Sequence, residues 1–511
     1  MDTRKNMRTR ILAAVLALCM AFALCACGSA ANTNSSAPGA EKIVRIGDLF
    51  ANTYTSLDPA KDSNGWWTAC LGISETLFRI NDDYSVTPWL AESAEADGSL
   101  WTITLKDNVV FSDGTKLTAE KAAESLQHAA EIVDSSPLAG AEIKAVDEKT
   151  LTVAAETPIA TLPNILTSPA YSMAILDGDS ALFTGPFAVT EFDPGVSIKA
   201  VKNTNYWDGE VKLDGVEGKY VADADTLSMA FQNGEIDAYI GPTTNDLALF
   251  QEAPEKYTVV STPSSRLYYY YLNMERLPEK NLRAAINMAI NSDEICALLS
   301  GLVSPTIGAY GPDTVFGNVT KNPYDPEKAK QLIEGLGYTL DADGYYAKDG
   351  QEIELDIAYY AARSIDKIVL LMQEQLKKVG IKATLTVSED PDGTYITTHD
   401  FDIGMYCMIA NPSADPYYFM DRIVGGGLYT AGGYHNDDAS AKLAELSGET
   451  DTARRAELAQ QIQQDVIDDE AMGFLALLNK TTCMRSGVSH CSETNPVSYY
   501  FLNANTDISG G

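Results

Sequence analysis

Residues that commonly carry bond-making chemistry are few and scattered in this sequence. The histidines are His128, His399, His435 and His490. No nucleophile elbow, zinc-protease motif or phosphate-binding loop occurs. Asp468 and Asp469 fall on a predicted helix, where adjacent side chains do not face each other, so we expect them to be solvated. The pair Asp400 and Asp402 keeps a carboxylate-based enzyme open as an alternative, but without these motifs we expect that the protein is not an enzyme.

Metal-ligating side chains are equally dispersed. His435, in the segment GGYHN at 432–436, is the best single candidate for a metal ligand, although no further ligands accompany it at the usual spacing. Cys483 and Cys491 are close enough in sequence for a disulfide across a hairpin, with two free thiols as the alternative. The widely spaced remaining cysteines are expected to be small buried hydrophobes: Cys70, Cys296 and Cys407. We therefore expect neither a cofactor nor a bound metal ion.

The beginning of the sequence has the pattern of an export signal. Basic residues from Arg4 to Arg10 precede an apolar run at 11–26, which is shorter than the roughly 20 residues of a membrane-spanning helix. The segment LCAC at 24–27 resembles the bacterial lipobox, in which Cys27 becomes the lipidated first residue. An ordinary cleaved signal or a retained anchor helix is the alternative. Residues 27–42, rich in Gly, Ala, Ser and Asn, predict a flexible tether behind the lipid anchor.

Composition limits the classes of partner. A formal net charge of −34 disfavours nucleic acid and anionic lipid headgroups as ligands. The chain after the signal is too long for one core, so it predicts two or more domains.

The pattern of elements changes near Tyr268. Before it, short strands with turn residues alternate with single helices. One of these helices is expected at 119–133, with Thr118 as its N-terminal cap. After it, longer helices alternate with strands, which predicts an α/β domain. The main expected helices are 119–133, 224–233, 282–290, 325–336, 365–379, 439–446 and 452–469. The main expected strands are 101–105, 109–111, 151–153, 236–240, 352–358, 382–387, 401–407 and a tail of strand character at 482–505.

Short motifs follow one another along the whole chain in an order that is specific when taken together. In the first half they are LDP at 57–59, ETLF at 75–78, PWLAE at 88–92, DGSLWTITL at 97–105, LTAE at 117–120, TGPF at 184–187, NTNYW at 203–207 and NGEID at 233–237. In the second half they are LN at 272–273, LRAAI at 282–286, YDPEKA at 324–329, GLGY at 335–338, DFD at 400–402, DP at 415–416 and GYHN at 433–436. By these motifs the chain resembles the extracytoplasmic solute-binding proteins of peptide and nickel ABC importers, solute-binding family 5.

This resemblance implies an α/β, bilobed periplasmic-binding-protein fold of type II, the Venus flytrap, with an extra strand-rich subdomain in lobe I. Lobe I would comprise 43–266 and 481–511, with the insert at about 73–183, and lobe II would comprise 267–480. The implied protein is a monomeric receptor on the outer face of the cell membrane, in a Gram-positive bacterium. It would capture a short peptide or peptide-like solute between the lobes and deliver it to the importer's permease and, through it, to the ATPase subunits. The alternatives are a nickel-chelate receptor and a ligand sensor for a signalling system.

The resemblance also indicates which segments face the ligand. In lobe I it indicates residues 61–67, with Asn64, Trp66 and Trp67. It also indicates the strand at 268–273, where the chain is expected to cross between the lobes. Alternation along this strand would turn two of its four tyrosines inward. In lobe II it implicates 406–415. The resulting candidates are Asn64, Trp66, Trp67, Tyr268, Tyr270, Tyr406, Met408, Asn411 and Tyr434, with His435 as a weak metal candidate.

Two departures from the family leave the ligand open. Peptide-binding members often carry a carboxylate for the peptide ammonium at the position of Pro412. The nickel-chelate members place an arginine at about Ser168 and aromatic residues at Ala410 and Ala414.

Overall fold

The computed structural model describes residues 41–49, 53–133, 136–156 and 158–509. The expected signal, Cys27 and nearly all of the tether lie outside these residues. Glu41–Ile508 forms one compact unit. In the described part of the chain, no helix is both long and apolar enough for a membrane span.

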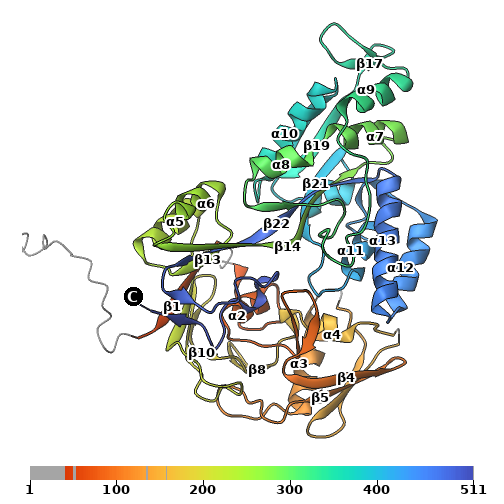
Figure 1. Cartoon of the computed structure of the whole chain (residues 1–511). Helices are drawn as coiled ribbons and strands as arrows, with labels where there is room; N and C mark the ends of the chain where they lie inside the picture. The colour runs from red at the N-terminus through yellow and green to blue at the C-terminus, as the bar shows by residue number, and fades with distance from the viewer. Residues whose placement is uncertain (1–40, 50–52, 134–135, 157, 510–511) are drawn as a thin grey trace, which may run out of the picture. The chain divides into compact units, whose positions relative to one another are not determined.

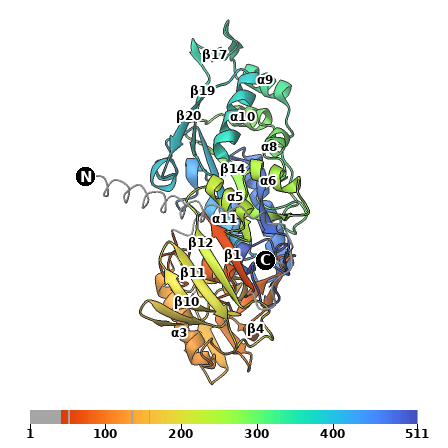
Figure 2. The same cartoon turned by 90° about the vertical axis from the view of Figure 1, so that its left-hand side faces the viewer.

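One mixed sheet of eleven strands runs through this unit, in the order β10-β11-β12-β1-β13-β22-β14-β21-β19-β20, with β15 beside β22 (Figure 1, Figure 2). Its strands are β1 Ile43–Asp48, β10 Phe187–Asp193, β11 Ser197–Lys202, β12 Gly215–Tyr220, β13 Ala238–Ile240, β14 Tyr257–Leu272, β15 Val303–Pro305, β19 Glu354–Tyr360, β20 Lys382–Ser388, β21 Ile403–Ile409 and β22 Met472–Arg485. β1 pairs in parallel with β12 and β13, and β19 pairs in parallel with β20 and β21. The second parallel group contains the α/β unit that the sequence predicted.

Two long antiparallel strands connect the two halves of the sheet. β14 and β22 pair from Tyr257 with Arg485 to Tyr271 with Met472. β22 contacts β13 at one end, and β14 contacts β21 at the other. A register shift between Pro263 and Arg266 interrupts this ladder beside the expected lobe boundary at 266/267.

A separate sheet, β4-β5-β7-β6, falls within the insert expected at about 73–183, and helix α3 (Ala119–Ile132) packs with it in one core. The smaller sheets contain the strands β2 Phe78–Ile80, β3 Val86–Pro88, β4 Ala91–Asp97, β5 Leu100–Leu105, β6 Glu142–Ala145, β7 Thr150–Ala154, β8 Ala174–Asp177, β9 Ser180–Phe183, β16 Thr339–Leu340, β17 Tyr346–Lys348, β18 Gln351–Glu352, β23 Val488–Ser489 and β24 Asp507–Ile508.

The helices confirm the predicted periodicities, with ends that differ by a few residues. They are α2 Asn64–Cys70, α3 Ala119–Ile132, α4 Leu162–Ile165, α5 Ala224–Asn233, α6 Thr244–Gln251, α7 Lys280–Ala289, α8 Ser292–Leu298, α9 Pro326–Gly335, α10 Ile365–Lys378, α11 Tyr417–Val424, α12 Asp437–Gly448 and α13 Thr452–Asp468. Short turns of helix are η2 Pro169–Tyr171, η3 Asp392–Ile396, η4 Ala431–Gly433 and η5 Ser498–Tyr500. Thr118 caps α3 as expected, because its side chain accepts a hydrogen bond from the Lys121 amide.

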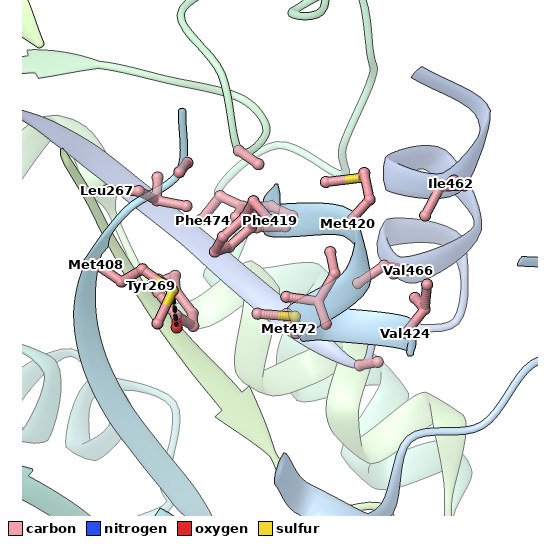
Figure 3. Close-up of a cluster of buried hydrophobic side chains, with 14 of the residues drawn as sticks. Leu267, Tyr269, Met408, Phe419, Met420, Val424, Ile462, Val466, Met472 and Phe474 are labelled. Carbon is pink, nitrogen blue, oxygen red and sulfur yellow. Dashed lines mark hydrogen bonds between the residues drawn. The ribbon is translucent and has the colours of Figure 1, made fainter. Parts of the chain in front are cut away.

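The largest core of the second half lies between the crossing strands and helices α11 to α13. Figure 3 shows Tyr269 and Leu267 of β14 packed with Phe419 of α11 and Phe474 of β22. Tyr268 and Tyr270 point to the opposite side, into a core under α7 and α10. Alternation along the tyrosine strand is therefore confirmed, but each face of the sheet is covered, so all four tyrosines are buried.

Two local predictions were wrong, and one alternative that the sequence left open, concerning two cysteines, is decided. Residues 109–111 form no strand, only an isolated bridge between Val110 and Lys116. The tail at 490–505 contains turns and the short η5 instead of a continuous strand, since the strand character ends at β23. Cys483 and Cys491 are both free thiols. They pack in two different apolar clusters, one with Phe231 and one with Val44, so no hairpin brings them together.

Candidate ligand-binding site

The segment 411–415, hereafter the 411–415 loop, touches residues that are distant from it in the sequence. The Asn164 side-chain amide in α4 donates hydrogen bonds to the main-chain oxygens of Ser413 (3.0 Å) and Ala414 (3.1 Å). The Tyr499 hydroxyl donates to the main-chain oxygen of Pro412 (3.2 Å). Three segments that are distant in sequence thus meet at one loop.

Aromatic side chains surround this contact. The rings of Trp66 and Tyr499 meet edge to face, with centroids 5.0 Å apart, and Tyr84 and Ala414 belong to the same apolar cluster. Trp66 lies on helix α2, where successive side chains point about 100° apart. Its neighbour Trp67 therefore faces the core, stacks on Tyr54 at 5.3 Å and is only 4% exposed. Of the two tryptophans, Trp66 alone is at the contact.

Asn411 carries an unused hydrogen-bonding atom. It is 3% exposed, and its Oδ1 has no hydrogen-bond partner among the described residues. Its main-chain oxygen accepts a hydrogen bond from the Ser265 hydroxyl at 3.1 Å. A buried acceptor without a partner is energetically costly, and such atoms in native structures commonly mark a place where a ligand or water completes the site.

A buried ion pair fixes the end of the 411–415 loop. Arg455 Nη2 of α13 lies 2.6 and 2.7 Å from the two carboxylate oxygens of Asp415. Both side chains are less than 10% exposed, and Arg455 Nη1 donates to the main-chain oxygens of Leu446 and Glu449. Each charge is thus compensated, as burial requires.

Positive charge lies close to the contact. Burial raises the pKa of the Tyr499 hydroxyl, neighbouring Tyr500 and Tyr418 add to the rise, and Arg266 of β14 opposes it. Burial likewise raises the pKa of Tyr360, and both Arg363 and Arg266 oppose that rise. Arg266 therefore lies close enough to the Tyr499 hydroxyl to act on its pKa, whereas Arg363 acts on Tyr360.

The remaining candidates of lobe I and the crossing strand have intramolecular partners. Asn64 is 1% exposed, and its side-chain amide donates to the Lys61 main-chain oxygen at 2.7 Å, which stabilises the turn before α2. The hydroxyls of Tyr268 and Tyr270 donate to the Arg363 main-chain oxygen (2.7 Å) and to Asn287 Oδ1 (2.6 Å). Contrary to the expectation that two tyrosines line the ligand site, both rings lie in the core, because helices cover the face of the sheet that they occupy.

The lobe II candidates lie mostly in the core as well. The Tyr406 hydroxyl donates to Asp392 Oδ1 at 2.6 Å, and the Tyr434 hydroxyl donates to Asp469 Oδ2 at 3.0 Å. Met408 accepts a weak hydrogen bond from the Tyr269 hydroxyl at 3.9 Å (Figure 3). Each of the three candidates is less than 10% exposed, so the structure brings only Trp66 and Asn411 to the contact.

His435 is separate from this contact. Its side chain is 75% exposed, and its Nε2 lies 3.0 Å from Asp437 Oδ1. Among the described residues, no group of three or more His, Cys, Asp or Glu side chains could hold a metal ion.

Asn164, Tyr84 and Tyr499 were absent from the predicted set. Tyr499 adjoins Tyr500 in the tail. This pair of aromatic residues is the local feature of the sequence that could have pointed to Tyr499 as a site residue. Its contact with Trp66 depends on the return of the chain through β22, which no local pattern reveals.

Comparisons with known proteins agree on one family. The model of the bacterial extracellular solute-binding proteins, family 5 Middle, matches residues 85–430. The nickel-binding periplasmic protein of Escherichia coli (strain K12) is 27% identical over 435 residues, which cover 79% of this chain and 81% of that protein.

Solved structures show the same fold. The nickel ABC transporter protein from Bacillus halodurans is 26% identical with a TM-score of 0.79, and the match covers 92% of this chain and all of that one. The periplasmic binding protein DppA from Helicobacter pylori, solved with the peptide STSA, is 21% identical with a TM-score of 0.70, and the match covers 91% and 98% of the two chains.

Proposed function

Since the chain belongs to family 5 of the bacterial extracellular solute-binding proteins, we propose that it is the receptor of an ABC importer that captures a short peptide or peptide-like solute. Its fold is the mixed α/β fold of the periplasmic binding proteins, as predicted. Its family binds solutes and is not catalytic, in agreement with the absence of catalytic motifs from the sequence.

The proposed ligand site is the contact between the 411–415 loop and Trp66. The observation that carries the proposal is the buried Oδ1 of Asn411 at this place, which has no hydrogen-bond partner in the described part of the chain. An amide or ammonium N–H of a peptide-like ligand supplies the missing donor. Trp66, Tyr84 and Tyr499 offer aromatic surface that buries a ligand without selecting its sequence. Arg266 supplies positive charge for a ligand carboxylate.

The proposed mechanism follows from the crossing strands. In this mechanism β14 and β22 join two lobes. Lobe I comprises 43–266 and 481–511, with its insert at about 73–183, and lobe II comprises 267–480. A ligand that contacts both lobes binds the closed form more tightly and shifts the equilibrium towards it. The closed receptor then engages the permease, and no bond chemistry is needed.

A nickel-chelate receptor is the second candidate. It is favoured by the likeness to the nickel-binding protein of Escherichia coli. In the described part of the chain no side-chain cluster suits a bare metal ion, so any nickel would arrive with its own chelator. A sensor that reports ligand to a signalling system is a third candidate, and neighbouring genes for permeases and ATPases would argue against it.

The proposed anchor at Cys27 keeps the receptor near its permease, outside the cell membrane of a Gram-positive bacterium. Changing Cys27 to Ser should release the protein into the medium with unchanged ligand affinity. Loss of ligand binding in the released protein would contradict the separation of anchor and receptor.

A thermal-shift screen tests the proposed function. Di- to pentapeptides, nickel–histidine chelates and Ni²⁺ alone would be compared, because a ligand that binds only the folded form raises the melting temperature. We expect the largest shift from a peptide, with no ligand consumed. A largest shift from Ni²⁺ alone that His435→Ala abolishes would make the receptor a direct metal binder, and sustained product release would make it an enzyme.

A further inference from the structure

A cavity of about 490 Å³ lies between residues of the segment 69–212 and the C-terminal tail at 490–505, and its volume is in the range of small-molecule sites. Its wall includes Glu75, Arg79 of β2, Trp89, Lys212 and Tyr500. Neither Trp66 nor Asn411 lines it, so it is separate from the proposed ligand site.

Arg79 is held in this wall by two aromatic rings. Its guanidinium carbon lies over the ring of Trp89 at 4.2 Å from the centroid and over the ring of Tyr500 at 4.3 Å. The N–H groups of a guanidinium lie in its plane and remain available when rings cover its faces. Within the described residues, no hydrogen bond or ion pair uses the N–H groups of Arg79. A fixed, charged group with unused donors binds an anion at little cost in conformational entropy.

The carboxylate of Glu75, which also lines the cavity, already accepts hydrogen bonds from other side chains. Glu75 accepts hydrogen bonds from the indole nitrogens of Trp89 and Trp207 (each 2.9 Å), from the Thr184 hydroxyl (2.8 Å) and from the Tyr206 hydroxyl (3.1 Å). Burial raises the pKa of Glu75, whereas Trp207, Trp89, Thr184 and Arg79 oppose the rise. Indoles can only donate, so Glu75 acts as an acceptor that orients the aromatic wall.

Further charged side chains face the same space. Lys212 lines the cavity, and Asp208 is its other carboxylate. Asp507 forms an ion pair with Lys42 at 2.8 Å, and Lys42 and, to a smaller extent, Lys212 lower the pKa of its carboxyl group. Arg79 and Lys212 thus face the cavity together with Glu75 and Asp208, and of these two carboxylates Glu75 already accepts four hydrogen bonds within the described residues.

We propose that this cavity binds a small oxyanion, whose carboxylate or phosphate oxygens accept the N–H groups of Arg79 while Lys212 supplies the second positive charge. Guanidinium groups bind both kinds of oxyanion through paired hydrogen bonds. The site is independent of the proposed importer function, because it uses none of the residues at the proposed ligand site.

Isothermal titration calorimetry of the purified full chain at constant ionic strength tests this site, with inorganic phosphate and succinate as separate probes. We expect saturable binding of one ion per chain. Preference for phosphate identifies an inorganic oxyanion as the ligand, and preference for succinate identifies an organic acid. Arg79→Lys keeps the charge but removes the paired donors, so it should weaken binding about tenfold or more. Lys212→Gln should also weaken it.

Lys144→Gln is the matched control, since Lys144 is an exposed lysine outside the cavity. It should leave the affinity unchanged. If Arg79→Lys loses the native circular dichroism spectrum, Lys212→Gln decides the outcome. Absence of saturable binding by both probes, or unchanged affinity in the decisive variant, would overturn the proposal.

Discussion

At the residue scale, the proposed ligand site depends on Trp66, a half-buried residue of the aromatic cluster. Trp66→Ala removes the ring that meets Tyr499 and leaves the core residue Trp67 in place. We expect affinity for the best ligand of the screen to fall by about tenfold or more, because an aromatic wall contributes roughly 1–3 kcal/mol. Titration calorimetry measures the change.

Tyr324→Ala is the control for this experiment. Tyr324 is 39% exposed and lines a different cavity. Equal losses of affinity in the two variants would contradict a ligand contact at Trp66.

Two adjacent arginines of α13 offer a matched test of burial. Arg455 pairs with Asp415 at less than 10% exposure, whereas the side chain of Arg454 is 35% exposed and pairs with Glu445 and Glu457. Arg455→Ala leaves a buried carboxylate unpaired, so the free energy of unfolding should fall by about 3–5 kcal/mol. Arg454→Ala should lower it far less, because solvent screens an exposed ion pair. Urea denaturation measures both, and similar costs would refute the argument from burial.

At the element scale, local sequence determined the helices well. The spacing of apolar residues predicted α10 and α13 almost to their ends, and Gly234 ends α5 in the left-handed conformation that glycine favours. Strands were harder to predict, since pairing decides whether an extended segment becomes a strand. Residues 109–111 have strand composition but acquire only one bridge to Lys116.

The cap of α3 can be tested directly. Thr118→Val removes the oxygen that accepts the Lys121 amide, so we expect a loss of about 1 kcal/mol in the free energy of unfolding. Thr118→Ser keeps the oxygen and should preserve most of that stability. Urea denaturation distinguishes the two, and equal losses would show that the cap contributes nothing.

At the scale of the whole molecule, Lys480 ties the returning tail to the crossing strand β22. Its ammonium donates to the main-chain oxygens of Ser492 (2.9 Å) and Asn495 (2.8 Å). Burial lowers its pKa to about 8, and the nearby acidic groups oppose this shift: Cys70, Asp82, Glu493 and Cys491.

This lowered pKa predicts a pH dependence. From about pH 8 to about pH 10.5 the unfolded chain binds a proton at Lys480 that the folded chain has lost, so this group makes the free energy of unfolding rise with pH. The difference between the native protein and Lys480→Met should rise by up to about 3 kcal/mol across this window. Urea denaturation at several pH values measures the difference, in which the tyrosine contributions cancel. Parallel curves would contradict the assignment.

By itself, the sequence determined the family, the α/β character and most helices, because motifs, helical periodicity and caps are properties of neighbouring residues. Only the tertiary structure decided which candidates reach the proposed site. It placed Tyr268 and Tyr270 in a core, since helices cover that face of the sheet, and it left Asn411 Oδ1 without a partner. It also brought Trp66 to Tyr499. That contact depends on the pairing of β14 with β22, which joins segments far apart in the chain, so no local pattern contains it.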